Sequence, residues 1–127
     1  MVWSVDNNLE VDLAAQVATA FANGSVQFYD GVGALLATCP IASATPDGSG
    51  NVVLVFTSAA VVAGIANASV ASATFFKSNG TTSLLSTNSV GTTPGNDINF
   101  DSGTGWNAGD SIQPGNVTLN LTNMTAT

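Results

Sequence analysis

The stretch from Phe21 to Ile41, FANGSVQFYDGVGALLATCPI, constrains the fold of this chain more than any other part of the sequence. Asn23-Gly24 is expected to end a helix, because glycine just after the last helical residue adopts the left-handed conformation without a Cβ clash. Residues 26–29 then alternate between apolar and polar, the period of a half-buried strand. Asp30-Gly31 marks a turn, and residues 34–41 return as a second apolar run. The stretch predicts a helix followed directly by a β-hairpin.

An amphipathic helix is expected before this hairpin, over about residues 8–23, with residues 1–7 forming an N-terminal arm. One helical face is defined by apolar residues that recur every four positions, namely Leu9, Leu13, Val17 and Phe21. Asn7, with Glu10 three residues later, resembles a capping box. The periodicity predicts that this face packs on the rest of the domain.

Short apolar or alternating runs, separated by turn residues, continue to the end of the chain. They cover residues 52–57, 68–77, 81–90, 97–101 and 116–122. Asn79-Gly80 is the strongest two-residue hairpin signal. Residues 43–51 have the composition of a loop, and residues 58–67 fit either a short helix or an irregular crossover. Together the runs predict an all-β (mainly β) fold, a jelly-roll-like or Ig-like β-sandwich with one N-terminal helix, in a single domain over residues 8–127.

Charged residues make up only 7% of the chain, and the net charge is −7. Lys77 is the only basic residue and there is no histidine. Binding to nucleic acid requires clustered Lys or Arg side chains, so no nucleic-acid partner is expected. An anionic membrane surface is disfavoured for the same reason. No segment has the features of a targeting signal or of a membrane span.

Enzymatic activity is not expected from this set of residues. Without His and Arg, the usual Ser-His-Asp and Cys-His arrangements are impossible, and the eight acidic residues are scattered without a diagnostic spacing. Asp97, Asn99 and Asp101 imitate the first half of a calcium loop, but Ser102 and Ala108 stand where such a loop needs Gly and Glu. We therefore predict a short strand there, with no metal site, no cofactor and no catalytic residue.

Two apolar features are candidates for contact with a partner. The arm carries Val2, Trp3 and Val5, which must pack either on their own domain or on another protein. Trp106, in a glycine-rich loop, either plugs the end of the core or contacts a partner. Cys39 lies in an apolar run with no basic neighbour, so it is expected to be a small buried hydrophobe.

The order of motifs resembles a family of small structural proteins encoded with the head genes of tailed bacteriophages. The motifs that match are VQFYDG (26–31), LLAT (35–38), ATFF (73–76), DINF (97–100) and VTLNLT (117–122). An amphipathic N-terminal helix precedes the first motif in that pattern. The resemblance covers the chain from Leu9 to Thr122. A Pro-Asp-Gly turn within residues 43–50 and the lack of basic residues in the helix depart from it.

This resemblance implies a non-enzymatic virion protein, first of all a decoration (cement) protein that binds and stabilises the capsid exterior. Such a protein is made in the host cytoplasm and has the major capsid protein as its partner. Because a small body offers limited contact area, self-association into a homodimer or homotrimer is also expected. Two alternatives are a head–tail or tail component and, from the β-sandwich and Trp106, a carbohydrate-binding or adhesin module.

Overall fold

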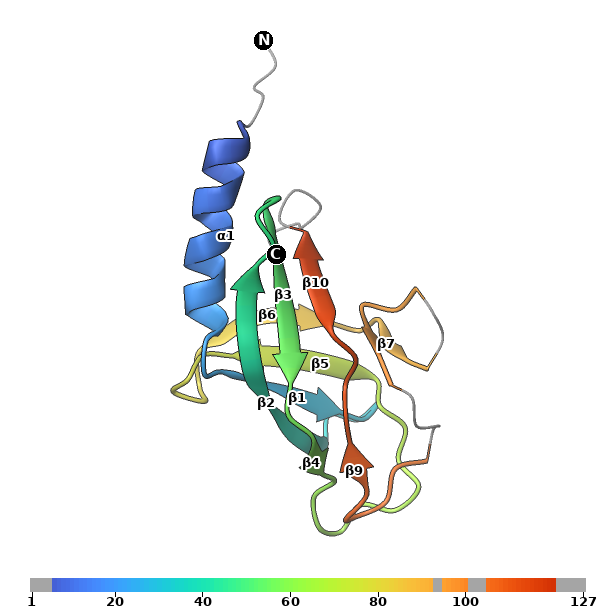
Figure 1. Cartoon of the computed structure of the whole chain (residues 1–127). Helices are drawn as coiled ribbons and strands as arrows, with labels where there is room; N and C mark the ends of the chain where they lie inside the picture. Colours follow the sequence, from blue (N-terminus) through green and yellow to red (C-terminus); the bar gives the residue numbers. More distant parts are fainter. Residues whose placement is uncertain (1–5, 93–94, 101–104, 121–127) are drawn as a thin grey trace.

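The computed structural model describes residues 6–92, 95–100 and 105–120 of the 127-residue chain (Figure 1). Within these ranges the chain forms one helix and ten strands. The helix is α1 (Asn7–Phe21), and the strands are β1 (Ser25–Tyr29), β2 (Leu35–Pro46), β3 (Asn51–Phe56), β4 (Ala59–Ala60), β5 (Ser72–Phe76), β6 (Ser83–Thr87), β7 (Val90–Gly91), β8 (Ile98–Asn99), β9 (Ser111–Ile112) and β10 (Val117–Asn120). The predicted mainly β class and the N-terminal helix are confirmed.

Six of these strands form one antiparallel sheet in the order β10-β3-β2-β1-β5-β6. The sheet curls into a half-barrel, so that in Figure 1 β2, β3 and β10 run steeply while β1 and β5 cross below them. Two small sheets accompany it, an antiparallel pair of β4 and β9 and a parallel pair of β7 and β8. β3 lies between β2 and β10, so it occupies the interior of the sheet.

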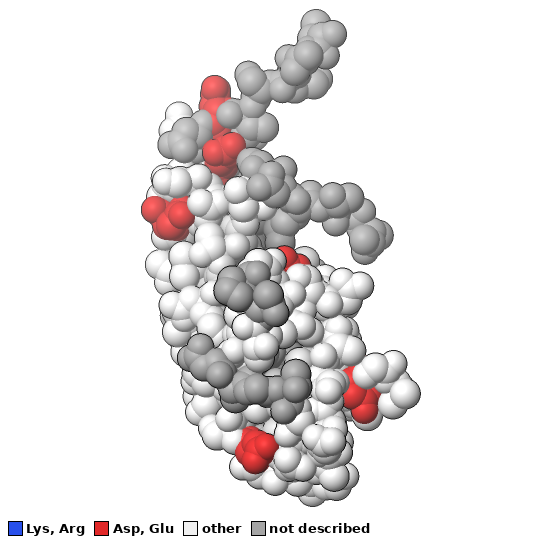
Figure 2. Space-filling model, turned by 90° about the vertical axis from the view of Figure 1, so that its right-hand side faces the viewer, with Lys and Arg blue, Asp and Glu red and all other residues white. Residues whose placement is uncertain are grey.

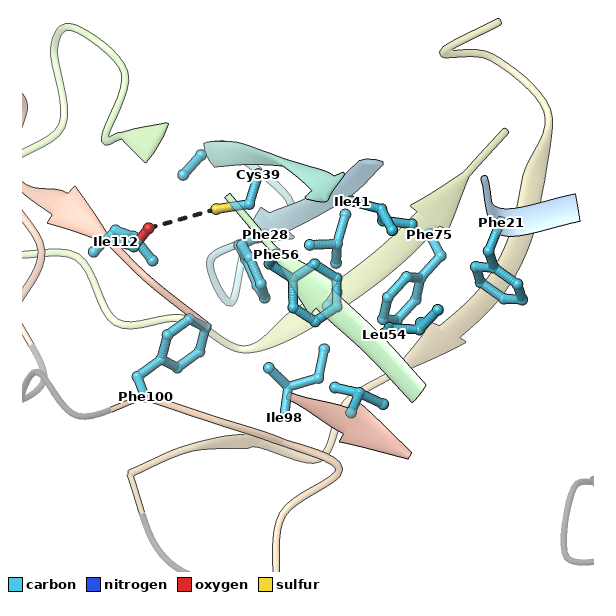
Figure 3. Packing of buried hydrophobic residues seen from close by; sticks show 14 of the residues in the cluster. Phe21, Phe28, Cys39, Ile41, Leu54, Phe56, Phe75, Ile98, Phe100 and Ile112 are labelled. Atoms are coloured by element: carbon cyan, nitrogen blue, oxygen red, sulfur yellow. Dashed lines mark hydrogen bonds between the residues drawn. The ribbon is translucent and has the colours of Figure 1, made fainter. Parts of the chain in front are cut away.

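The core forms on one face of the curled sheet because buried and partly exposed residues alternate along its strands. The pattern is regular in β1, β3 and β5, and in β10 buried Val117 and Leu119 alternate with exposed residues. Aromatic rings fill the centre (Figure 3): Phe28 meets Phe100 edge-on, with their ring centroids 5.0 Å apart. Such T-shaped pairs add about 0.5–1.5 kcal/mol beyond the area that they bury.

Helix α1 packs beside β2 and β3. The C-terminal half of the predicted face is confirmed, because Phe21 is buried and Val17 packs against the core, whereas the N-terminal half is wrong. Ala14, Ala18 and Phe21 are buried, and the Phe21 ring lies edge-on to Phe75 with centroids 5.7 Å apart. Leu9 and Leu13, which were expected in the core, are 51% and 44% exposed. The small alanine side chains allow the helix to approach the sheet closely, which rotates the leucines of the first two turns outward.

Both ends of α1 differ from the predicted capping. Asp6 is the N-cap residue and makes no side-chain capping hydrogen bond, while Asn7 is already helical, so the capping-box prediction is wrong. At the other end Asn23 takes the left-handed conformation, with φ of 60°, and Gly24 does not. Gly24 is required for another reason, because a Cβ at this position would lie 2.2 Å from the carbonyl oxygen of Phe76. Asn23 is therefore the left-handed residue that follows the helix and its cap residue Ala22, and Gly24 lets the end of β5 approach the chain.

The predicted loop over residues 43–51 is also wrong in its first half. β2 continues to Pro46, because residues 43–46 pair with β3 in register and this pairing overrides their polar, turn-like composition. Only residues 47–50 form the turn, in which the Asp47 carboxylate accepts hydrogen bonds from the backbone N–H groups of Ser49 and Asn51. Residues 58–67 contain β4 and turns and no helix, which confirms the irregular crossover.

The remaining predicted elements are present with small shifts of their ends. Asn79-Gly80 forms the β5–β6 turn, with Gly80 at φ of 74° and the Asn79 side-chain oxygen accepting from the backbone of Thr81 and Thr82. The DINF segment contains β8, and both of its apolar side chains, Ile98 and Phe100, are buried as expected for a strand.

Candidate interaction surfaces

Trp106 is a core residue, with only 3% of its surface exposed. Its backbone exchanges two hydrogen bonds with Ala68, with N–O distances of 2.7 and 2.9 Å. Its ring meets Phe100 and Phe28 edge-on, at centroid separations of 5.0 and 6.0 Å. The indole therefore plugs the end of the core, which was one of the two predicted alternatives, and it offers almost no surface to a partner. Its inclusion among the candidate contact residues is corrected accordingly.

The other candidate contact residues, Val2, Trp3 and Val5, lie outside the described residues. The structure instead exposes apolar side chains that the sequence did not single out as contacts. The first are Leu9 and Leu13 on α1. Their four-residue spacing predicts that they face the core. The structure shows that Ala14 and Ala18 face the sheet in their place. These two leucines are called the helix patch below.

The second exposed apolar feature is the β1–β2 turn, which is called the hairpin tip below and covers residues 30–35. Val32, at its apex, is 91% exposed. The Asp30 carboxylate accepts hydrogen bonds from the backbone N–H groups of Val32 and Ala34, at 3.0 and 2.8 Å. Gly33 has a φ of 88°, a backbone conformation that residues with a side chain rarely adopt. The tip is thus held in one conformation by its own aspartate while it presents valine to solvent.

The charged residues close to these features are acidic: Glu10 and Asp12 lie beside the helix patch on α1, and Asp30 belongs to the hairpin tip. Figure 2 shows one face on which the acidic side chains lie apart from one another in a largely uncharged surface. Lys77, the only basic residue of the chain, is exposed. This surface can therefore offer a partner apolar side chains, neutral hydrogen-bonding groups and isolated acidic groups, but almost no basic ones.

The DINF segment has its polar groups engaged within the protein. The Asp97 carboxylate accepts a hydrogen bond of 2.6 Å from the Thr87 hydroxyl, and the Asp97 N–H donates to the Ser89 hydroxyl. The Asn99 amide donates to the Asn96 carbonyl oxygen, and Asp101 lies outside the described residues. In the part of the chain that is described, no three acidic, cysteine or histidine side chains come together as metal ligands.

Cys39 is fully buried, as predicted. Its thiol faces the carbonyl oxygen of Ile112, with the sulfur 3.7 Å away (Figure 3). Burial raises the pKa of the thiol to about 11, and a hydrogen bond from the backbone at Ala59 opposes this only in part. A thiol of this kind packs as a hydrophobe and is a poor nucleophile.

A cleft of about 490 Å³ opens between the two edge strands of the large sheet, β6 and β10. Its floor consists of apolar side chains, namely Phe75, Leu85, Ile98, Val117 and Leu119. The polar residues that line it are Ser86, Thr87, Asn96, Asp97, Thr118 and Asn120. One of these residues, Asp97, is acidic, and its carboxylate accepts the hydrogen bond from the Thr87 hydroxyl.

Among the described residues, no helix combines the length and hydropathy that crossing a membrane would require. Comparisons of the chain with protein-family models, with curated proteins and with solved structures found no match.

Proposed function

We propose that this chain is a non-enzymatic virion structural protein that binds the exterior of a tailed-phage capsid as a decoration, or cement, protein. The observation that carries the proposal is the exposure of apolar side chains at two separate places, the helix patch and the hairpin tip, on a surface with almost no charge. Contiguous apolar patches with a polar rim mark protein–protein contact sites, and the helix patch and the hairpin tip are our candidates for the centres of such sites.

The resemblance to phage head proteins supports the same function. Its motifs coincide with structural elements: VQFYDG covers most of β1 and its turn, LLAT begins β2, and ATFF lies in β5. The last two motifs contain β8 and β10. We also propose that the half-barrel with its two small sheets is a variant of the jelly-roll-like sandwich that the resemblance implies.

Attachment without charged groups requires a contact of sufficient area. A standard stable interface buries about 800 Å² on each partner, whereas the whole chain exposes 7237 Å². One capsid contact of that size would take about a tenth of the surface. Placement of a homodimer or homotrimer on a capsid symmetry axis multiplies the contacts, and linked contacts raise avidity without new chemistry.

Capsid binding can be tested with purified capsids that lack this protein. We expect the full chain to co-sediment with them, to appear as density on their outer surface in electron microscopy, and to raise their thermal stability. A chain carrying both Leu9→Gln and Leu13→Gln is expected to bind at least tenfold more weakly, and Thr57→Gln is a matched surface control.

Two outcomes would replace this proposal. Density confined to the portal or tail would indicate a head–tail or tail component. Submicromolar binding to a glycan array, without capsid binding, would indicate a carbohydrate-binding or adhesin module. The burial of Trp106 removes the stacking surface that first suggested the latter.

A further inference from the structure

The outer face of α1 changes shape along its length. In the N-terminal half the helix patch projects from the surface, because Leu9 and Leu13 are about half exposed. In the C-terminal half a shallow hollow of about 570 Å³ lies against the small side chains of Ala15 and Ala20. Lys77, at the start of the β5–β6 turn, forms another part of its lining. One helix therefore carries both a projecting half and a hollowed half.

Helical geometry places these features on the same side of α1. Because an α-helix turns about 100° per residue, Leu9, Leu13 and Ala20 lie within about 40° of one another around its axis. Asp12 and Thr19 lie within about 20° of each other on the neighbouring strip. Both are exposed, and Thr19 lines the hollow. An apolar strip and a polar strip thus run side by side along the exposed face.

A second copy of the helix, running antiparallel about a two-fold axis, complements this face. In such an isologous contact the same patch meets itself, so the N-terminal half of each helix lies against the C-terminal half of the other. Leu9 of one copy then enters the hollow of the other copy beside Ala20, and the two Leu13 side chains meet near the axis. The positive end of each helix dipole also lies beside the negative end of the other.

The charges near α1 favour the antiparallel arrangement over a parallel one. Asp6 and Asp12 are exposed at the N-terminal end of the helix, so a parallel pair would bring like charges together. In the antiparallel pair Asp12 approaches the hollow of the other copy, which contains Lys77, the only basic residue of the chain. Because exposed ion pairs contribute little affinity, this contact sets the orientation, and burial of the leucines holds the dimer together.

We propose that two copies of this chain associate through the outer faces of α1 as an antiparallel, two-fold dimer. Figure 1 shows the helix along one edge of the molecule, where a second copy can reach it. With 15 residues the helix is about 22 Å long, so the contact is smaller than the about 800 Å² per partner of a standard interface. We therefore expect a weak, reversible dimer.

This inference goes beyond the proposed function, because the dimer forms without a capsid. It assigns the helix patch to self-association and leaves the hairpin tip for the capsid. The weaker capsid binding expected of the chain with Leu9→Gln and Leu13→Gln then follows from lost avidity.

Sedimentation of the full chain without capsids, over a hundredfold range of concentration, tests the dimer. We expect the wild type and the Thr57→Gln control to dimerise reversibly. The chain with Leu9→Gln and Leu13→Gln should dimerise at least tenfold more weakly with an unchanged circular dichroism spectrum. A wild type that stays monomeric throughout would overturn the proposal, since the helix patch is then open or covered by its own chain. A dimer that withstands both substitutions is joined elsewhere, which would overturn it too.

Single cysteines on α1 test the orientation. With Leu9 opposite Ala20, the two-fold axis passes between residues 14 and 15, so the two copies of residue 16 lie close together and the two copies of residue 8 lie about 20 Å apart. Both positions are exposed, and buried Cys39 remains in every variant. On mild oxidation we expect Gln16→Cys to form a disulfide-linked dimer at least tenfold faster than Asn8→Cys. Equal rates, or a faster Asn8→Cys, would contradict the antiparallel pair.

A charge exchange tests the contact between Asp12 and Lys77. Asp12→Lys and Lys77→Asp are each expected to weaken the dimer at least threefold, because like charges then meet, and the combination of both should restore the wild-type affinity. If Asp12→Lys strengthens the dimer through its lower net charge, or if the double variant fails to recover, the proposed arrangement is wrong. None of these measurements uses a capsid, so failure to bind capsids would count against the proposed function alone.

Discussion

Gly24 shows how a single residue can be required for a reason other than the one its type suggests. The Asn-Gly pair predicts a left-handed glycine, yet the asparagine takes that conformation. The glycine instead lies against the backbone of β5, where a side chain would meet the carbonyl oxygen of Phe76. The sequence identifies the pair as a helix end, but a contact with a strand some fifty residues later is invisible in it.

We expect Gly24→Ala to destabilise the protein by more than about 2 kcal/mol, because overpacking against backbone cannot be relieved by a rotamer change. Gly31→Ala is the matched control, since a Cβ at Gly31 meets nothing within 4 Å. It should change the free energy of unfolding by less than about 0.5 kcal/mol. Urea unfolding of both variants measures the difference, and similar values for the two would contradict the contact.

The buried thiol of Cys39 gives a prediction about pH. The unfolded thiol loses its proton near its ordinary pKa of 9.0, whereas the folded thiol keeps it up to about 11. Between these values the unfolded state binds fewer protons, so stability falls as pH rises. The loss attributable to Cys39 is at most about 3 kcal/mol.

Thermal unfolding of the wild type and Cys39→Ala between pH 8 and 11 tests this effect. Burial also raises the pKa of Tyr29, so both proteins should lose stability, but the wild type should lose more. If the stability of the two proteins falls in parallel as the pH rises, Cys39 does not contribute to the pH dependence. Thiol-reagent labelling of the native wild type at pH 8 should be at least about a hundredfold slower than that of a free thiol, given its small thiolate fraction.

At the scale of elements, the sequence located most strands but not the limits of all of them. The alternation of apolar and polar residues, together with the turn residues between the runs, was sufficient to predict β1, β3, β5 and β10. Each of these strands has one buried and one less buried face. The second half of β2 was missed because Ser, Ala, Thr and Pro carry little strand signal. Those residues form a strand because they pair with β3, and sheet pairing is not visible in the local sequence.

The candidate contact surface was predicted less well than the fold, again for a physical reason. A four-residue repeat shows that Leu9 and Leu13 share a helical face, but not whether a sheet covers it. Ala14 and Ala18 are buried instead, and their small volume carries a weak hydrophobic signal. The location of Trp106 could not be predicted, because tryptophan is common both in cores and at interfaces. Its ring contacts with Phe28 and Phe100 show that it belongs to the core.

The face that α1 buries can be tested by paired substitutions. We expect Leu13→Gln to change the free energy of unfolding by less than about 1 kcal/mol, because the side chain is largely exposed. Ala18→Leu should cost about 1–3 kcal/mol, since it adds volume to a filled position. Chemical denaturation measures both. If L13Q costs more than A18L, the orientation of the helix is wrong.

At the scale of the whole molecule, the scarcity of charge predicts how assembly responds to salt. Ion-pair attachment weakens as salt screens it, with a Debye length of about 10 Å at 0.1 M. With Lys77 as the only basic residue, we expect capsid binding to be no weaker at 500 mM than at 50 mM NaCl. Lys77→Gln should bind as the wild type does. Tenfold weaker binding at the higher salt concentration would show that ionic contacts dominate.

The position of β10 at the edge of the large sheet determines when the protein is able to fold during its synthesis. Val117 and Leu119 are core residues that pair with β3, far earlier in the sequence. A ribosome adds about 5–20 residues per second, so a nascent chain spends seconds with β3 made and its neighbour still missing. Folding must wait until residue 120 has left the ribosome, and during that interval the unpaired edge of β3 is open to other nascent chains on the same messenger RNA.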